Sequence, residues 1–140
     1  MAPTLNIRTF RPADAAAVRD LFSQGLLDFA MGFEEPLREY IQHSLADDLA
    51  DISASYLKEP GGHFWVAESE GQIKGMVGIQ RRTREEAELR RMSVAADSRR
   101  QGIGSRLLET AESFCREQGY LRIRLTTVSL LQPAIALYRK

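Results

Sequence analysis

The sequence predicts a single α/β (α+β) domain over residues 1–140, built around a mixed β-sheet. Its length of 140 residues fits one domain and leaves no room for two. The apolar residues change between helical and strand spacing, which gives the predicted order β-α-α-β-β-β-α-β-α. Near the middle of the chain, a strand passes through a short charged loop directly into an amphipathic helix. Together these observations predict a sheet with helices packed against it.

The first elements are a strand and two helical segments. Asn6–Phe10 is short and contains β-branched and aromatic residues, which is typical of an edge strand. Pro12 ends it, and apolar residues at helical spacing then predict a helix through Leu26, with Gly25 and Gly32 marking its end. A second apolar stripe predicts one continuous helix over 36–58, which the Pro- and Gly-containing turn at 59–62 ends.

The middle of the chain changes to strand spacing. His63–Glu68 and Ile73–Gln80 read as two strands joined by the turn Ser69-Glu70-Gly71-Gln72, which predicts a hairpin. The polar run 81–86 predicts a loop, and Glu88–Val94 is the next predicted strand.

The last predicted elements are a helix, a strand and a short helix. Residues 102–118 place Ile103 and Leu107 on one apolar face, and Gly119 ends the helix. Leu121–Val128 alternates as a strand does, and a final helix is predicted over 134–138 after a proline.

Composition and charge argue against several classes of protein. Nineteen basic residues balance nineteen acidic ones, whereas proteins that bind nucleic acid usually carry a basic excess. No run approaches the ~18 consecutive apolar residues of a membrane span, and no secretory signal is visible. The single cysteine, Cys115, cannot form an internal disulfide and excludes a cysteine-built zinc site. We therefore expect a cytoplasmic protein without a metal site.

The segment from Glu88 to Gly104 carries the chemical signal. The first amides of a helix have no acceptor within the helix and lie at the positive end of its dipole, so they bind anions. Gly102 and Gly104 leave the backbone accessible, and Arg99 and Arg100 add charge. The segment therefore predicts a phosphate or diphosphate site. A glycine-rich helix start with solvated arginines is an equally weighted alternative.

Two better-known phosphate-binding patterns do not fit this segment. A P-loop ends in Gly-Lys-Ser/Thr, and the dinucleotide fingerprint needs a third glycine where this chain has Leu107. ATP hydrolysis and nicotinamide chemistry therefore lose most of their support.

The same segment resembles motif A of the GNAT acetyltransferases. The resemblance rests on Arg99-x-x-Gly102-x-Gly104 and on the preceding strand Leu89–Val94, and it continues to Leu137-Tyr138. It covers nearly the whole chain, and Phe64–Glu68 is most similar to the camello-like branch of the family. The resemblance implies the GNAT fold, with the fourth and fifth strands of the mixed sheet splayed apart by a β-bulge.

The resemblance also implies acetyl-CoA as the cofactor. In the family its pantetheine arm pairs with the fourth strand like an extra strand, and its diphosphate takes the amides at the start of the following helix. The residues that this implies for cofactor binding are Met92, Ser93, Val94, Arg99, Arg100, Gln101, Gly102, Ile103, Gly104 and Ser105.

The implied reaction is transfer of an acetyl group to a primary amine in a ternary complex. An ammonium has no lone pair, so a base must first remove a proton. Glu88 is the first candidate for this base and Glu68 the second, although each is equally well explained as an ordinary ion-paired glutamate. Tyr138 matches the tyrosine that acts as the acid in the family, and its alternative role is packing in the core.

The chain departs from the family pattern in two places. Leu131 stands where the family often has an asparagine. After Tyr138 the family normally continues into two more strands, whereas this chain ends at Lys140. We therefore expect a sheet that lacks these strands. Either the chain is a piece of a longer product, or its bare edge at Leu121–Val128 pairs with a neighbouring subunit in a homodimer or stays mobile.

Two other functions compete with catalysis. A non-catalytic acyl-CoA-binding module would share the anion site and need neither base nor acid. Nucleic acid binding through the arginine-rich middle is disfavoured by the zero net charge. The acceptor class stays open between peptide and small-molecule amines, and the acidic stretch 34–51 weakly favours a cationic one.

Overall fold

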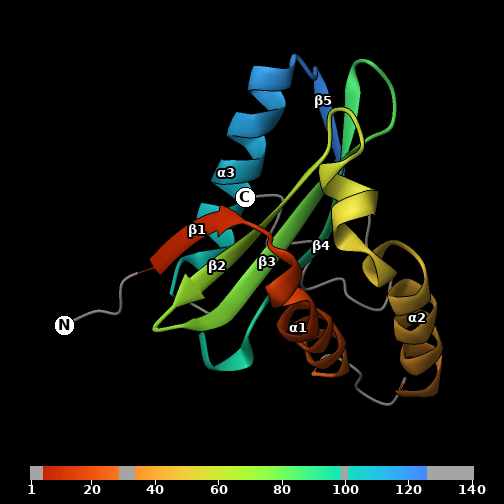
Figure 1. The fold of residues 1–140 in the computed structure, drawn as a ribbon, viewed down its shortest axis with the longest axis vertical. Coiled ribbons are helices and arrows are strands. Elements are labelled where there is room, and N and C mark those ends of the chain that lie inside the picture. The colour runs from red at the N-terminus through yellow and green to blue at the C-terminus, as the bar shows by residue number, and fades with distance from the viewer. Residues whose placement is uncertain (1–4, 29–33, 99–100, 126–140) are drawn as a thin grey trace.

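A five-stranded mixed sheet organises the molecule (Figure 1). The computed structural model describes residues 5–28, 34–98 and 101–125. The strands, which lie in chain order across the sheet, are β1 (Leu5–Thr9), β2 (His63–Ser69), β3 (Gln72–Arg81), β4 (Glu86–Val94) and β5 (Arg122–Leu125). Neighbours are antiparallel from β1 to β4, whereas β5 is parallel to β4. The mixed α+β sheet predicted from the sequence is confirmed.

The helices cover both faces of this sheet. α1 (Ala15–Leu27) and α2 (Glu34–Ala46) lie on one face, which we call the α1–α2 face. α3 (Ile103–Gln118) lies on the other, the α3 face, and supplies the crossover that a parallel β4–β5 pair needs.

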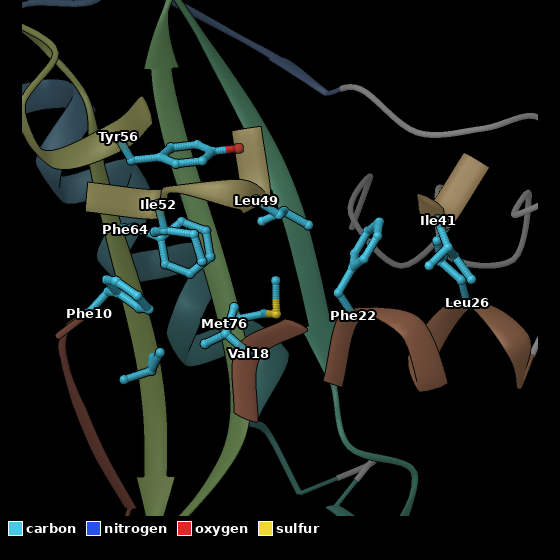
Figure 2. Close-up of a cluster of buried hydrophobic side chains, with 11 residues drawn as sticks. Phe10, Val18, Phe22, Leu26, Ile41, Leu49, Ile52, Tyr56, Phe64 and Met76 are labelled. Carbon is cyan, nitrogen blue, oxygen red and sulfur yellow. The ribbon is translucent and has the colours of Figure 1, made fainter. Parts of the chain in front are cut away.

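Side chains alternate along the strands and divide the core into two layers. On the α1–α2 face the buried cluster, shown in Figure 2, consists of Phe10, Val18, Phe22, Leu26, Ile41, Leu49, Ile52, Tyr56, Phe64, Val66 and Met76. On the α3 face the buried cluster consists of Trp65, Ala67, Val77, Ile79, Ala87, Leu89, Ile103, Leu107, Ala111, Cys115 and Tyr120.

One helical segment agrees with the sequence-based expectation and one differs. α1 includes Gly25 and ends at Leu27, one residue after Leu26. The stretch 36–58, expected as one helix, is broken: α2 ends at Ala46, a 3₁₀ turn covers Asp48–Ala50, and a π-helical turn covers Ser53–Leu57.

The break leaves the apolar stripe in the core and places one charge there as well. Asp47 leaves the helix with φ −98° and ψ −117°. The apolar residues that follow are still buried, namely Leu49, Ile52 and Tyr56. Asp48 is also buried, at 5% exposure, and its carboxylate is paired with side chains from the sheet.

Several predictions concern residues outside the described parts of the chain. Arg99, Arg100 and Tyr138 are among them, as are the final helix and the last three residues of the strand predicted at 121–128. The homodimer across the β5 edge stays a prediction. Within the described residues, no helix combines the length and apolar character that crossing a membrane requires.

Candidate cofactor-binding and active site

The start of α3 has the geometry of an anion site. Gly102 precedes the helix with φ +80°, in the left-handed region that favours glycine. Within the described residues, no side chain caps this helix end. The Arg106 amide donates to the Gly102 carbonyl at 3.1 Å, so the amides of 103–105 lie before the first hydrogen bond of the helix. Such amides bind negative charge, and the helix dipole adds to their effect.

Space is open around the two glycines. A Cβ at Gly102 would meet no atom within 4 Å, and one at Gly104 would meet only Val94 Cγ2, at 3.8 Å. Gln101 and Ser105 are exposed beside them. Ile103 differs, because its side chain is buried against the sheet and only its amide is available to a ligand. Open glycines and outward amides fit a diphosphate group.

The loop before α3 is fixed to the sheet. The Ala95 amide donates to the Lys74 carbonyl at 2.8 Å, and Lys74 Nζ donates to Asp97 Oδ2 at 3.0 Å. α3 itself packs closely on β3, since a Cβ at Gly75 would lie 2.8 Å from Leu107 Cδ1. The position of the anion site relative to β4 is therefore set by backbone contacts and close packing.

A β-bulge interrupts β4 at the start of the predicted cofactor-binding stretch Met92–Val94. Gly78 pairs with Arg90 and Met76 with Ser93, so Arg91 and Met92 together face Val77. Arg91 has φ +59°. The bulge lies where the resemblance to the GNAT family implies one.

From Met92 onward, the side chains of β4 face alternate sides of the sheet. Met92 and Val94 pack against the α3-face cluster. Ser93 faces α1, where its Cβ lies 3.7 Å from the position of a Cβ on Gly25. β5 pairs with β4 from Glu86 to Leu89. In the described part of the chain, the C-terminal half of β4 therefore has a strand neighbour on the β3 side only.

Glu88 lies close to this region. Its neighbour Leu89 packs on the α3 face, so Glu88 faces the α1–α2 side. It is opposite Gln80 of β3 and Arg124 of β5. Its side chain is 14% exposed, and its Oε2 lies 3.8 Å from Arg82 Nη1.

Glu68, the second candidate base, lies on a different strand from Glu88. It is on β2, which β3 separates from β4. Arg8 Nε donates to Glu68 Oε1 at 3.3 Å, and the same guanidinium donates to Asp14 Oδ2 at 2.8 Å. The ion pair of Glu68 links β1 to β2, and Glu68 lines the same cavity as Val94 at the end of β4.

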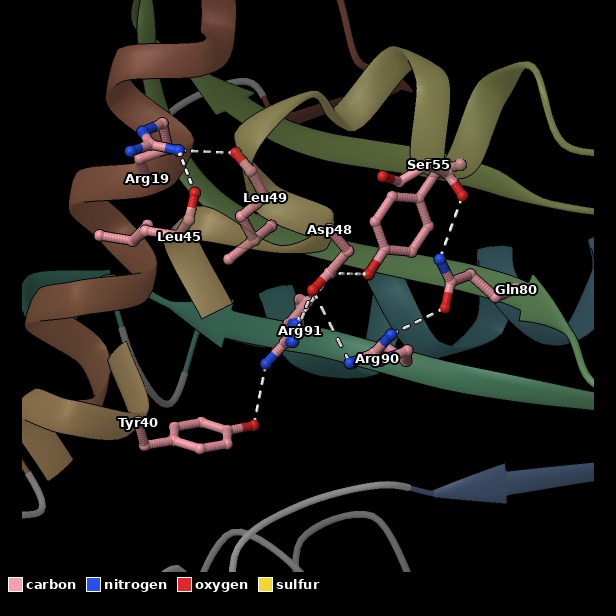
Figure 3. A network of polar contacts seen from close by, with 10 residues as sticks. Arg19, Tyr40, Leu45, Asp48, Leu49, Ser55, Gln80, Arg90 and Arg91 are labelled. Atoms are coloured by element: carbon pink, nitrogen blue, oxygen red, sulfur yellow. Dashed lines mark hydrogen bonds and ion pairs between the residues drawn. The ribbon is translucent and has the colours of Figure 1, made fainter. Parts of the chain in front are cut away.

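A buried polar network lies beneath the bulge, and sequence reasoning missed it (Figure 3). Arg91 donates through Nε and Nη2 to the Asp48 carboxylate, at 3.0 and 2.6 Å. Tyr56 Oη donates to the same carboxylate, and Arg90 Nη2 lies 3.7 Å from it. Arg91 Nη1 donates to Tyr40 Oη at 2.8 Å. The consecutive arginines were a visible signal, but nothing local marked Asp48 as buried.

Electrostatics keep this network charged. Burial opposes ionisation of Asp48, but the hydrogen bonds from Arg91 and Tyr56 outweigh it and hold the pKa of Asp48 below its ordinary value. Burial and the neighbouring carboxylate raise the pKa of the Tyr56 hydroxyl, which therefore stays protonated. The network holds one carboxylate between two guanidinium groups.

A cavity of about 640 Å³ adjoins the end of β4. It is bounded by α1, by the β2–β3 turn and by the residues after the bulged strand, among them Gln24, Gly71, Val94 and Ala96. The cavity gives a ligand on the C-terminal end of β4 space on the α1–α2 side of the sheet.

Cys115 is excluded as a nucleophile. It is 2% exposed on the core face of α3, and burial raises the pKa of its thiol to about 11. This agrees with its position on the apolar stripe of the sequence.

Comparison with known proteins identifies the family. The model of the acetyltransferase (GNAT) family matches residues 26–140. N-acetyltransferase 8 of Rattus norvegicus is 42% identical over 109 residues, which are 74% of this chain and 49% of that protein. N-acetyltransferase 8 of Homo sapiens is 41% identical over 111 residues, 76% of this chain and 49% of that protein. The chain thus spans about half the length of the curated relatives it matches.

Solved structures share the fold. A GNAT-family acetyltransferase of Staphylococcus aureus Mu50 matches with a TM-score of 0.80 and 25% identity, over 97% of this chain and 82% of that one. The PaiA N-acetyltransferase of Thermoplasma acidophilum, solved in complex with coenzyme A, matches with a TM-score of 0.81 and 20% identity. The match covers 97% of this chain and 87% of that one. The strand–bulge–glycine arrangement and these relatives agree: the chain belongs to the acetyltransferase (GNAT) family, in its camello-like branch.

Proposed function

We propose that this chain is the catalytic domain of an N-acetyltransferase that transfers the acetyl group of acetyl-CoA directly to a primary amine. Family membership makes acetyl-CoA the cofactor. The observation that carries the proposal is the start of α3, where Gly102 and Gly104 leave uncapped amides open beside the bulged end of β4. The acceptor is a peptide or small-molecule amine.

The main chain of this domain holds the cofactor. The amides from Gln101 to Ser105, with Arg99 and Arg100, bind the diphosphate, and the backbone of Met92, Ser93 and Val94 binds the pantetheine arm. Bound acetyl-CoA supplies an activated acyl group as a thioester. A backbone amide near Val94 donates to the negative charge that develops on the thioester oxygen.

Side chains move the protons. The Glu88 carboxylate takes a proton from the acceptor ammonium, directly or through water, which exposes the nitrogen lone pair. The nitrogen then attacks the thioester carbon, and the C–S bond breaks as the Tyr138 hydroxyl gives its proton to the departing sulfur. The Tyr138 oxygen regains a proton from the nitrogen, which becomes the amide. Support for Glu88 is its place on β4, facing the α1–α2 side, two residues before the bulged stretch begins.

Gly102→Asp tests the cofactor site. The new Cβ and carboxylate enter the anion site, so we expect coenzyme A to bind at least about tenfold more weakly by calorimetry, equal to ~1.4 kcal/mol. Gly119→Asp is the matched control, because Gly119 has φ +84°, equally open surroundings and a position at the opposite end of α3. Equal affinity in Gly102→Asp and the parent protein would reject the diphosphate assignment.

Glu88→Gln tests catalysis. We expect kcat to fall by about 10²-fold, while coenzyme A affinity stays within about twofold. Glu86→Gln is the control, since Glu86 lies on the same face of β4 and also pairs with Arg82. Thiol release across a panel of amines measures turnover. Cofactor binding by the parent protein without any thiol release would instead indicate a binding module.

A further inference from the structure

The backbone of Arg91 needs a physical explanation. Among the described residues other than glycine, only Glu70, in the β2–β3 turn, and Arg91 have positive φ. A left-handed conformation disfavours a residue with a long side chain, and it persists only where the surroundings enforce it. Arg91 lies inside a strand, so no turn enforces it there.

The side chain of Arg91 supplies that enforcement. It is buried, with both Nε and Nη2 on the Asp48 carboxylate and Nη1 on Tyr40 (Figure 3). Its guanidinium also lies over the Phe22 ring, 5.2 Å from the ring centre. Consecutive residues of a regular strand face opposite sides, yet Arg90 and Arg91 both reach the same carboxylate. Only a bulged backbone allows this arrangement.

Asp48 is held equally firmly. It lies in the 3₁₀ turn that interrupts the helical stretch after α2, and it accepts hydrogen bonds from Arg91 and Tyr56. Removing its charge would leave two guanidinium groups without their shared partner in a buried site, which is costly. The break after α2 and the bulge in β4 therefore depend on one ion pair.

The bulge determines which groups of β4 face the open side of the strand. Because side chains and main-chain groups alternate along a strand, a slip of one residue exchanges the two faces and the two edges. Without the bulge, each side chain of Met92–Val94 would face the opposite side of the sheet. The N–H and C=O groups that now lie on the edge away from β3 would then face β3 instead.

We infer that Asp48 and Arg91 are positioning residues, which act through the β4 bulge to keep the cofactor-binding edge of Met92–Val94 in register. This inference rests on the proposed function. Neither side chain needs to touch the cofactor or the acceptor, because the ion pair fixes the β4 backbone, and this backbone contacts the cofactor.

Asp48→Asn and Arg91→Lys test the inference. Asparagine keeps the size of Asp48 and removes its charge, and lysine keeps the charge of Arg91 and loses the bidentate geometry. At a temperature where each variant is fully folded, we expect the Kd of coenzyme A and the KM of acetyl-CoA to rise about tenfold or more. The KM of the acceptor should change by less than about threefold. Asp47→Asn, at the exposed neighbouring position, is the matched control.

A readout without cofactor makes the test independent of activity. In amide NMR spectra of the unliganded protein, both variants should shift the signals of Met92–Val94 more than those of the β1–β2 pair. Variants with lower melting temperatures but parental coenzyme A affinity and parental β4 signals would overturn the inference. If Asp48→Asn does not fold, Arg91→Lys alone decides. Absence of coenzyme A binding in the parent protein would refute the proposed function, while the NMR comparison would still judge the role of Asp48 and Arg91 in the bulge.

Discussion

Two glycines on β3 let bulky side chains reach both faces of the same strand. A Cβ at Gly75 would lie 2.8 Å from Leu107 Cδ1 and 2.9 Å from Ile103 Cγ2. A Cβ at Gly78 would lie 2.7 Å from Tyr56 Cε1, on the opposite face. Such distances are too short for real contacts, so these positions require the absence of a side chain.

Gly75→Ala should therefore destabilise the protein. Its methyl group would push the start of α3 away from the sheet, and we expect the free energy of unfolding to fall by about 1–3 kcal/mol. Gly25→Ala is the control, because a Cβ there meets Ser93 at an ordinary 3.7 Å. In the last turn of α1, alanine should be neutral or stabilise by up to about 1 kcal/mol. Urea unfolding measures both, and equal losses would contradict the packing argument.

At the scale of elements, Arg8 connects three segments. From β1 it donates to Asp14, at the end of the 3₁₀ turn before α1, and to Glu68 on β2. The hydrogen bond from Arg8 is the largest cause that holds the pKa of Asp14 below its ordinary value of 3.8, against the opposing effect of burial. A lowered pKa adds stability above the ordinary value, and this stability is lost as pH falls through the folded value.

Asp14→Asn should remove part of the acid sensitivity. At pH 7 we expect the free energy of unfolding to fall by about 1–3 kcal/mol, because charged hydrogen bonds to Arg8 are lost. Below the ordinary pKa of Asp14, the difference between the variant and the parent protein should shrink. Urea titrations between neutral and acid pH measure this, with the exposed Asp20→Asn on the same helix as reference. A difference that does not change with pH would contradict the ion pair.

The elements that sequence reasoning predicted well are those that local chemistry defines. Short apolar runs on either side of a turn marked β2 and β3, and Gly119 ended α3 as predicted, with φ +84°. The break within 36–58 was missed because its short turns keep the apolar stripe facing the core, so the periodicity continues through it.

In the candidate site, too, the residues with a local sequence signature were predictable and those that depend on distant partners were not. Gly102 and Gly104 were predictable because a helix start with glycines has a local signature. Asp48 was not, because its burial depends on a partner 43 residues away in the chain, Arg91. Acidic residues near it in the sequence are mostly exposed, and composition alone cannot separate the buried one.

At the scale of the whole molecule, the two core layers share one sheet. Val18 on α1 lies in one layer and Trp65 on β2 in the other. The sheet strands contribute to both, so the layers should unfold together.

Val18→Ala tests this coupling. The variant removes fully buried methyl groups on the α1–α2 face and should lower the free energy of unfolding by about 2–3 kcal/mol. Emission of Trp65, the single tryptophan, reports on the α3 face. Its unfolding midpoint should shift as far as that of far-ultraviolet circular dichroism. Gln24→Ala, at an exposed position of α1, should shift neither. Separate midpoints in Val18→Ala would show that the two layers unfold independently.

The parallel β4–β5 pair also affects how the chain folds. β2, β3 and β4 follow one another through short connections, so their pairings close small loops and cost little entropy. β1 pairs with β2 across both first helices, from Leu5 to Ser69, and β5 joins β4 only after α3. Low contact order therefore favours the central meander as the folding nucleus, with both edge strands added late. Pulsed hydrogen exchange should find protection in β3 and β4 before β1 or β5, so the bulged strand β4 is in place before the edge strands are added.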